Sequence, residues 1–243
     1  MKKLLNPKIL PWFTMGAGGL GLALQLWFWA GMDEKGLLPA SHPALPITYI
    51  LTALALAVIF LCARQLPPIA KYSRLFPAGM GRAVGCAAGG AGVLYAGIYC
   101  LLHSSTLGIV TFAVSLIAAA AMGYLAFLRK KGGRPAMALH TVLTVFLMLF
   151  LICNCRHWGS EPQIQSYIFP LFAGVFLMLG GYWSTVVDVR KSSRQWLVFS
   201  NQAALFFCCL SLAGKNRFFY LMMIIYLALD LCCVSKGRQP EEA

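Results

Sequence analysis

The sequence predicts an all-α fold: a polytopic bundle of eight transmembrane helices in a single integral membrane domain, residues 1–243. Apolar residues make up 60% of the chain and charged residues only 11%, whereas soluble chains average about half and about a quarter. The mean hydropathy is +0.74. Eight apolar stretches approach or exceed the roughly 20 residues that a helix needs to cross a bilayer. These observations exclude a disordered chain, a fibrous repeat and an ordinary soluble enzyme.

The eight predicted spans are separated by short connections. They are residues 9–30, 47–63, 83–102, 107–128, 135–155, 168–187, 195–213 and 218–234. The longest connection, residues 64–82, is too short for a soluble domain. We therefore expect any site to be built from helices and short loops.

The first predicted span resembles a signal peptide at its start, because three lysines precede its apolar run. The run is too long for a signal peptide, Pro11 interrupts its start, and Trp27, Phe28 and Trp29 replace the small residues of a cleavage site. We interpret it as a retained helix with an aromatic belt at its far end.

Small residues in three of the spans predict close helix packing. The third span repeats Gly81, Gly85 and Gly89 at every fourth position, and the first and fourth spans are rich in glycine and alanine. Small side chains let helix backbones approach each other in lipid. The pattern predicts packing of spans one, three and four against each other or, alternatively, a dimer interface.

The seventh span is the least apolar, because it contains Ser200, Asn201 and Gln202. A re-entrant segment is the alternative. If the seventh segment did not cross the membrane, the C-terminus would lie on the other side. The asymmetry of Lys and Arg described next would then be lost.

Basic residues predict the orientation. Of the 20 Lys and Arg, 16 fall on the side that holds both termini, so the positive-inside rule places both termini in the cytoplasm. We expect a multi-pass protein of the cell (cytoplasmic) membrane. The basic loops would face anionic lipid headgroups, which accounts for the net charge of +13 without nucleic acid.

Polar residues within the spans predict a layer in the cytoplasmic third of the bundle. Asp230 is the clearest member, because a buried carboxylate needs a proton or a partner. The layer comprises Asp230, His140, Asn201, Gln202, Ser184 and Tyr124. One interpretation is a cytoplasm-facing cavity for a substrate, ion or proton. The other is structural hydrogen bonding, with Asp230 extending toward Lys236 and Arg238.

A second set of polar residues lies in the predicted external loops. It comprises Asp33, Glu34, His42, His103 and His157. The three histidines lie in three different loops without metal-ligand spacing, so we predict no metal site and no cofactor. The nine cysteines lie mostly in apolar runs and are interpreted as packing residues rather than a disulfide framework.

These features favour a protein that handles a small solute or an ion, transporter-like or an accessory subunit, and predict no catalytic residues. The alternatives are an intramembrane enzyme acting on lipid or isoprenoid, with Asp230 and His140 nearest to an acid–base pair, and a non-catalytic scaffold. Partners would be the lipid bilayer and either a second copy, as a homo-oligomer, or a partner membrane subunit. Phosphate-binding loops and hydrolase signatures are absent from the sequence.

The stretch from Asp33 to Pro39 with His42 and Pro43, after a glycine-rich span that ends in aromatics, resembles a group of uncharacterised multi-spanning membrane proteins of Gram-positive, clostridial-type bacteria. The resemblance covers roughly the first 45 residues. It implies a cytoplasmic membrane location and no particular activity.

Overall fold

The described part of the computed structural model is all-helical, which confirms the all-α part of the prediction. It covers residues 9–31, 42–66, 78–104, 106–132, 137–158, 164, 167–189 and 194–234. Eight α-helices lie within it: α1 (Leu10–Ala30), α2 (Ala44–Arg64), α4 (Met80–His103), α5 (Thr106–Lys131), α6 (Met137–Trp158), α7 (Ile168–Val189), α8 (Arg194–Ser211) and α9 (Arg217–Val234). Each falls on one predicted span, with ends displaced by a few residues.

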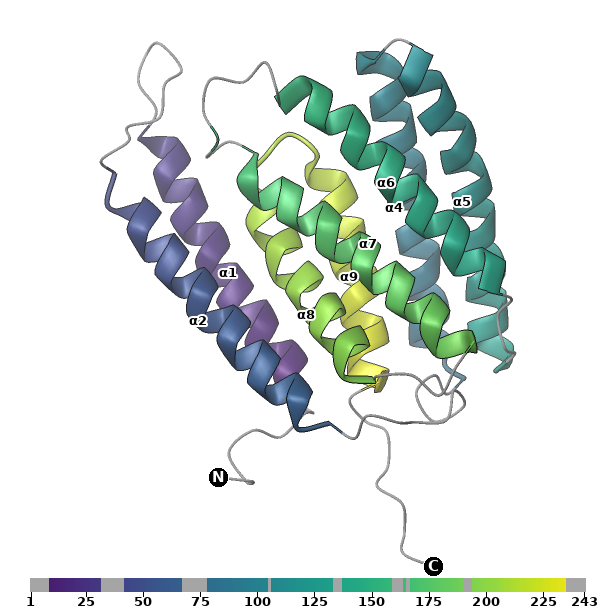
Figure 1. Cartoon of the computed structure of the whole chain (residues 1–243), viewed down its shortest axis with the longest axis horizontal. Coiled ribbons are helices and arrows are strands. Elements are labelled where there is room, and N and C mark those ends of the chain that lie inside the picture. Colours follow the sequence, from purple (N-terminus) through teal and green to yellow (C-terminus); the bar gives the residue numbers. More distant parts are fainter. Residues whose placement is uncertain are drawn as a thin grey trace, which may run out of the picture.

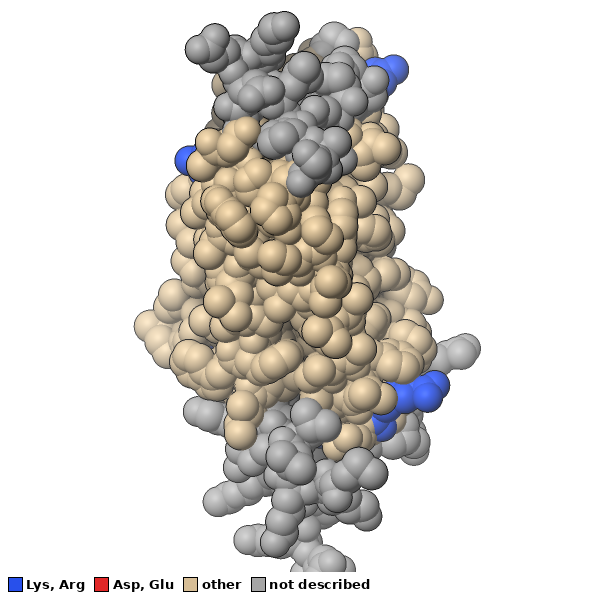
Figure 2. Space-filling model, turned by 90° about the vertical axis from the view of Figure 1, so that its left-hand side faces the viewer, with Lys and Arg blue, Asp and Glu red and all other residues tan. Residues whose placement is uncertain are grey.

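Five of these helices are long and apolar enough to cross a membrane: α2, α4, α5, α6 and α7. The longest, α5, has 26 residues, which corresponds to about 39 Å at 1.5 Å per residue. A middle band without charge is visible in Figure 2, where Lys and Arg lie only toward the two ends of the face shown. This pattern is typical of helices in contact with hydrocarbon.

Successive helices run in opposite directions through the bundle (Figure 1). The helix α1 begins, and α9 ends, at the same end of the bundle. We call this the basic end, because most of the described Lys and Arg residues lie there: Arg64, Arg82, Arg129, Lys130, Lys131 and Arg194. Arg156, Lys215 and Arg217 lie at the other end, which we call the opposite end.

The helix α8 lies at the centre of the fold, in contact with α1, α2, α7 and α9. Every residue from Ser200 to Ser211 is buried. Because neighbouring helices enclose α8, its polar residues Asn201 and Gln202 are shielded from lipid. The helix α8 is a single uninterrupted segment. Because other helices enclose it, a sequence of modest hydropathy can occupy the centre of the bundle.

The glycine stripe of α4 packs against α9. A Cβ atom added to Gly85 would lie 3.2 Å from Leu229 Cβ, and one added to Gly92 would lie 2.8 Å from Met222 Cβ. Close packing of the third span is thus confirmed, within this chain rather than between copies, and α4 also packs against α5.

The partner predicted for the first span is wrong. The glycines of α1 that make close contacts, Gly18 and Gly21, face Cys209 and Leu210 of α8. The cause is the central position of α8, which separates α1 from α4 and α5. Among the described helices, α1 packs mainly against α8 and α2, and it has no substantial contact with α4 or α5.

Candidate functional site

The packing of α4 against α9 brings two charged residues together at the basic end. Arg82 lies in the first turn of α4, and Asp230 lies four residues before the end of α9. The two helices are antiparallel, and Gly85 packs against Leu229 between them. One turn beyond this close contact, the side chains of Arg82 and Asp230 therefore meet.

Arg82 and Asp230 form a buried ion pair. Arg82 Nη2 lies 3.2 Å from Asp230 Oδ1, and the exposed fractions of the two side chains are 0% and 10%. The same nitrogen donates a hydrogen bond of 3.4 Å to the backbone carbonyl of Asp230. These contacts join the start of α4 to the end of α9 with a charge-assisted interaction, stronger than a neutral hydrogen bond.

A second buried arginine, Arg129, lies near this pair. It is only 4% exposed and belongs to the last turn of α5, which extends beyond the predicted span. Its guanidinium lies within electrostatic range of Cys86 and Tyr226. The backbone N–H of Gly79 donates to the Arg129 carbonyl at 3.1 Å. We call Arg82, Arg129 and Asp230 the charged cluster.

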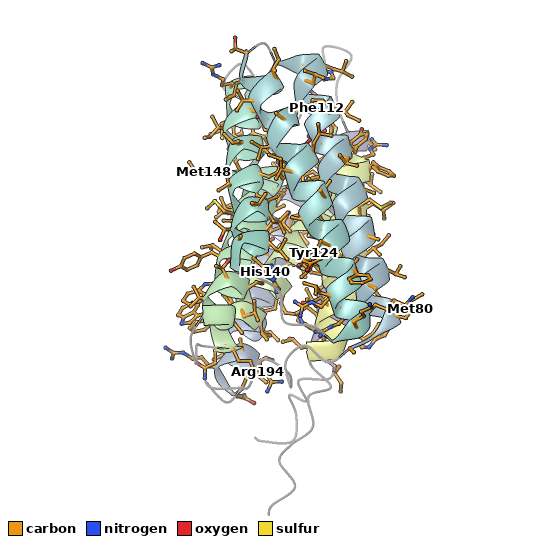
Figure 3. The ribbon with its side chains drawn as sticks, turned by 90° about the vertical axis from the view of Figure 1, so that its right-hand side faces the viewer. Met80, Phe112, Tyr124, His140, Met148 and Arg194 are labelled. Atoms are coloured by element: carbon orange, nitrogen blue, oxygen red, sulfur yellow. The ribbon has the colours of Figure 1, made fainter. Side chains whose placement is uncertain are left out.

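His140, on α6, lies beside the charged cluster. Its side chain is 2% exposed and within electrostatic range of Arg129. Figure 3 places it toward the same end of the bundle as Met80, the first residue of α4, and far from Phe112 near the opposite end. Four helices, α4, α5, α6 and α9, therefore contribute polar or charged side chains to this region.

The other residues of the predicted polar layer lie elsewhere. Asn201 packs against Gly180 of α7, so it belongs to the α7–α8 contact. Ser184 Oγ donates to the Gly180 carbonyl of its own helix at 2.8 Å. Gln202 is buried on α8. Tyr124 is 54% exposed and stacks on Phe127 on the outer surface of α5.

The predicted partners of Asp230 are wrong, because its ion-pair partner is Arg82 rather than His140, Asn201 or Gln202. The sequence reasoning assigned Arg82 and Arg129 to loops, whereas α4 begins two residues before Arg82 and α5 continues two residues past Arg129. The sequence did contain a signal for these contacts. Each arginine lies next to a predicted span, on the predicted cytoplasmic side, and Asp230 is nearest to that same side. Lys236 and Arg238 lie outside the described residues.

The predicted external residues do not come together among the described side chains. His42 Nδ1 accepts a hydrogen bond of 3.3 Å from the backbone N–H of Ala44 at the start of α2, and its ring lies 5.1 Å from that of Trp27. His103 stacks on Tyr99, one turn earlier in α4. Asp33, Glu34 and the His157 side chain lie outside the described part.

Metal and disulfide chemistry find little support in the described residues. Within them, no three His, Cys, Asp or Glu side chains are grouped so as to hold a metal ion. The described cysteines have free thiols, and most are buried. Thr111 and Cys153, for example, lie in side-chain contact at 3.2 Å between α5 and α6.

Compared with protein-family models, with curated proteins and with solved structures, the chain has no match.

Proposed function

We propose that this chain is a multi-pass integral membrane protein of the bacterial cell membrane that handles a small solute or ion at the charged cluster. It has eight spans and both termini in the cytoplasm, so the cluster lies near the cytoplasmic surface. It acts as a transporter or as an accessory subunit of one. The five membrane-length helices and the charge difference between the two ends support this proposal.

The observation that carries the proposal is the buried ion pair of Arg82 and Asp230, with Arg129 beside it. A buried ion pair is weak support for stability, because desolvation offsets most of its Coulombic attraction, and apolar residues of similar volume often serve as well. Ionisable residues inside membrane bundles instead mark binding sites and pathways. Arg82, Arg129 and Asp230 are ionisable residues of this kind.

The two alternatives find less support. An intramembrane enzyme would need an acid and a base facing a reacting bond, yet Asp230 is engaged by Arg82. A scaffold that associates through the α4 stripe would need those glycines on an open face, yet Gly85, Gly89 and Gly92 pack against α9.

Reporter fusions test the orientation. A reporter placed after Ala243 should be active in the cytoplasm, and one inserted within residues 31–46 should be active outside. A cytoplasmic signal from both positions would contradict the eight-span topology.

Electrical recording tests the activity. Proteoliposomes adsorbed on a solid-supported membrane would be exposed to concentration jumps of Na⁺, K⁺, H⁺, chloride, phosphate and small carboxylates. At least one should give a current with the wild type that disappears in the Arg82→Gln, Asp230→Asn double variant, whose cluster lacks the pair but gains no net charge. Absence of any protein-dependent current would contradict charge-moving transport by this chain alone and leave the accessory-subunit form of the proposal.

A further inference from the structure

A run of aromatic rings lines the side of the bundle where α8 lies between α2 and α7 (Figure 1). Both α2 and α7 pack against α8, and among the described helices their backbones have no substantial contact with each other. Side chains of α8 therefore reach the surface between them. Trp196 is 44% exposed, and three half-buried rings adjoin it. We call this set the aromatic face: Phe60, Phe176, Trp196 and Phe199.

The rings of the aromatic face are in contact with one another. The ring centroid of Phe199 lies 6.0 Å from that of Trp196, 5.9 Å from that of Phe176 and 5.7 Å from that of Phe60. Three helices, α2, α7 and α8, thus contribute to one continuous apolar surface.

This surface extends about as deep as one leaflet of a bilayer. Trp183 of α7 stacks on Trp196 at 6.2 Å, toward the basic end. Phe172, which is 40% exposed, lies eleven residues from Trp183 in the same helix, or about 16 Å along the helix axis. The hydrocarbon core of a bilayer is about 30 Å thick, so a single acyl chain has the length of this surface.

An exposed cation lies at the basic end of the aromatic face. Arg64 is the last residue of α2, and its Cζ atom lies 4.8 Å from the ring centroid of Phe60. The Phe60 ring in turn lies 6.4 Å from that of Trp196. Contact with a ring stabilises the guanidinium without using its five N–H donors in hydrogen bonds.

Gln195 fixes Arg64 beside Trp196. Its Nε2 atom donates to the backbone carbonyl of Arg64 at 3.2 Å and to that of Leu66 at 2.8 Å. Carbonyls at the end of a helix have no partner within the helix, so these bonds tie the end of α2 to the start of α8. The cation and the indole are therefore held together before any ligand binds.

The chemistry of these groups matches that of a phospholipid headgroup. The planar fork of arginine fits phosphate oxygens, and the indole N–H of Trp196 is a further donor. Trp and Arg are also common where helices meet headgroups. A phospholipid carries its phosphate and its acyl chain in sequence along the bilayer normal, and Arg64 and the aromatic face follow in the same sequence.

We infer that Arg64 and the aromatic face bind an anionic phospholipid of the leaflet at the basic end. Its phosphate lies on Arg64 and Trp196, and one acyl chain lies along the rings. The site is separate from the proposed solute handling, because the charged cluster belongs to α4, α5 and α9.

Lipid binding to the purified full-length chain in maltoside micelles tests the inference. Melting temperature is measured against increasing phosphatidylglycerol, with phosphatidylcholine of the same acyl chains as the reference, and native mass spectrometry counts the lipids retained. Arg64→Gln removes the cation, and Trp196→Phe removes the indole N–H but keeps a ring.

Lys131→Gln is the matched control. Lys131 is also exposed, lies at the same end of the bundle, and has its Nζ atom 4.3 Å from the ring centroid of Phe127. It belongs to α5, away from the aromatic face. A general attraction of anionic lipid to the basic end would weaken equally in Arg64→Gln and Lys131→Gln.

Phosphatidylglycerol should raise the melting temperature of the wild type more than phosphatidylcholine does, with at least one phosphatidylglycerol retained. Arg64→Gln should weaken the apparent affinity about tenfold, since charge-assisted hydrogen bonds are lost, and Trp196→Phe should weaken it severalfold. Lys131→Gln should stay close to the wild type. Arg64→Lys serves if Arg64→Gln does not fold; it keeps the charge without the fork and should weaken binding severalfold.

The inference is overturned if the wild type does not prefer phosphatidylglycerol, if the Arg64 variants bind it as the wild type does, or if Lys131→Gln loses as much as Arg64→Gln. It is also overturned if light scattering shows a dimer that Trp196→Phe dissociates while the lipid preference is unchanged. In that case the aromatic face binds a second copy of the chain.

Discussion

The neutral polar residues of the bundle and its charged cluster satisfy their polar groups in different ways. Thr48 Oγ1 donates to the Ala44 carbonyl at 2.7 Å, and Ser184 and Ser211 likewise bond to the carbonyl one turn earlier in their own helices. Asp230 and Arg82, by contrast, are 148 residues apart in sequence and pair between two helices. A hydroxyl can be satisfied locally, whereas a buried charge requires a partner from another helix.

The comparison teaches which polar residues of a membrane bundle carry information about function. A serine or threonine that bonds to its own helix is compatible with almost any packing. A charge that depends on a second helix fixes the position of that helix, and replacing a buried ion pair by apolar residues is often neutral for stability.

The largest effect is expected from breaking the ion pair. Asp230→Ala should lower the free energy of unfolding by about 3–5 kcal/mol, because it leaves the buried Arg82 without its carboxylate. Thermal or denaturant unfolding in detergent measures this loss. Arg156→Ala, an exposed charge at the opposite end, is the control. Equal effects of the two changes would show that the cluster is open to water.

Overpacking of the α4–α9 contact comes next. Gly92→Ala places a Cβ 2.8 Å from Met222 Cβ and 3.4 Å from the Phe219 carbonyl oxygen, so backbone or side chains must shift, at a cost of about 1–3 kcal/mol. Gly123→Ala on α5, with no neighbouring atom within 4 Å of the added Cβ, should cost nothing. A reversed order of melting temperatures would mean that α4 and α9 are not in contact.

A smaller effect is expected for a neutral hydrogen bond between helices. Asn216 Nδ2 donates to Asn154 Oδ1 at 3.4 Å, joining α6 to the residue before α9. Hydrogen bonds between membrane helices average about 0.6 kcal/mol, so Asn216→Ala should lower stability by about that amount. A loss of stability close to that of Asp230→Ala would contradict the expected difference between neutral and charged pairs.

The smallest effect is expected where a hydroxyl bonds within its own helix. Ser184→Ala removes a bond to the Gly180 carbonyl, which already belongs to the helix ladder. The melting temperature should change less than for Asn216→Ala. A large loss would indicate that Ser184 also supports Asn201, which packs against the same glycine.

Much of the fold could be predicted from the sequence, because apolar length and small-residue spacing are local properties. The eight helices and the close packing of Gly85 and Gly89 followed from such patterns. The neighbour of α1 did not, because nothing in a glycine pattern states which helix it faces. The central position of α8 could not be predicted, because its polar residues lower its hydropathy. In the structure these residues are enclosed by neighbouring helices.

The candidate site could be predicted in part. Asp230 and His140 were found because ionisable residues are rare within spans. Arg82 and Arg129 were missed because charged residues at the end of an apolar run look like loop residues, while the helix in fact continues through them. Tyr124 was wrongly included in the polar layer. Its depth along the helix matched the layer, but depth does not determine which side of the helix a residue occupies.

The central claim is that the ion pair of Arg82 and Asp230 is retained for function rather than for stability. Its most direct test is the Arg82→Met, Asp230→Leu double variant, measured for thermal stability and for the solute-dependent current shown by the wild type. The account predicts a melting temperature equal to or above that of the wild type, together with complete loss of the functional signal. A double variant that is much less stable than the wild type, or one that keeps the signal, would contradict it.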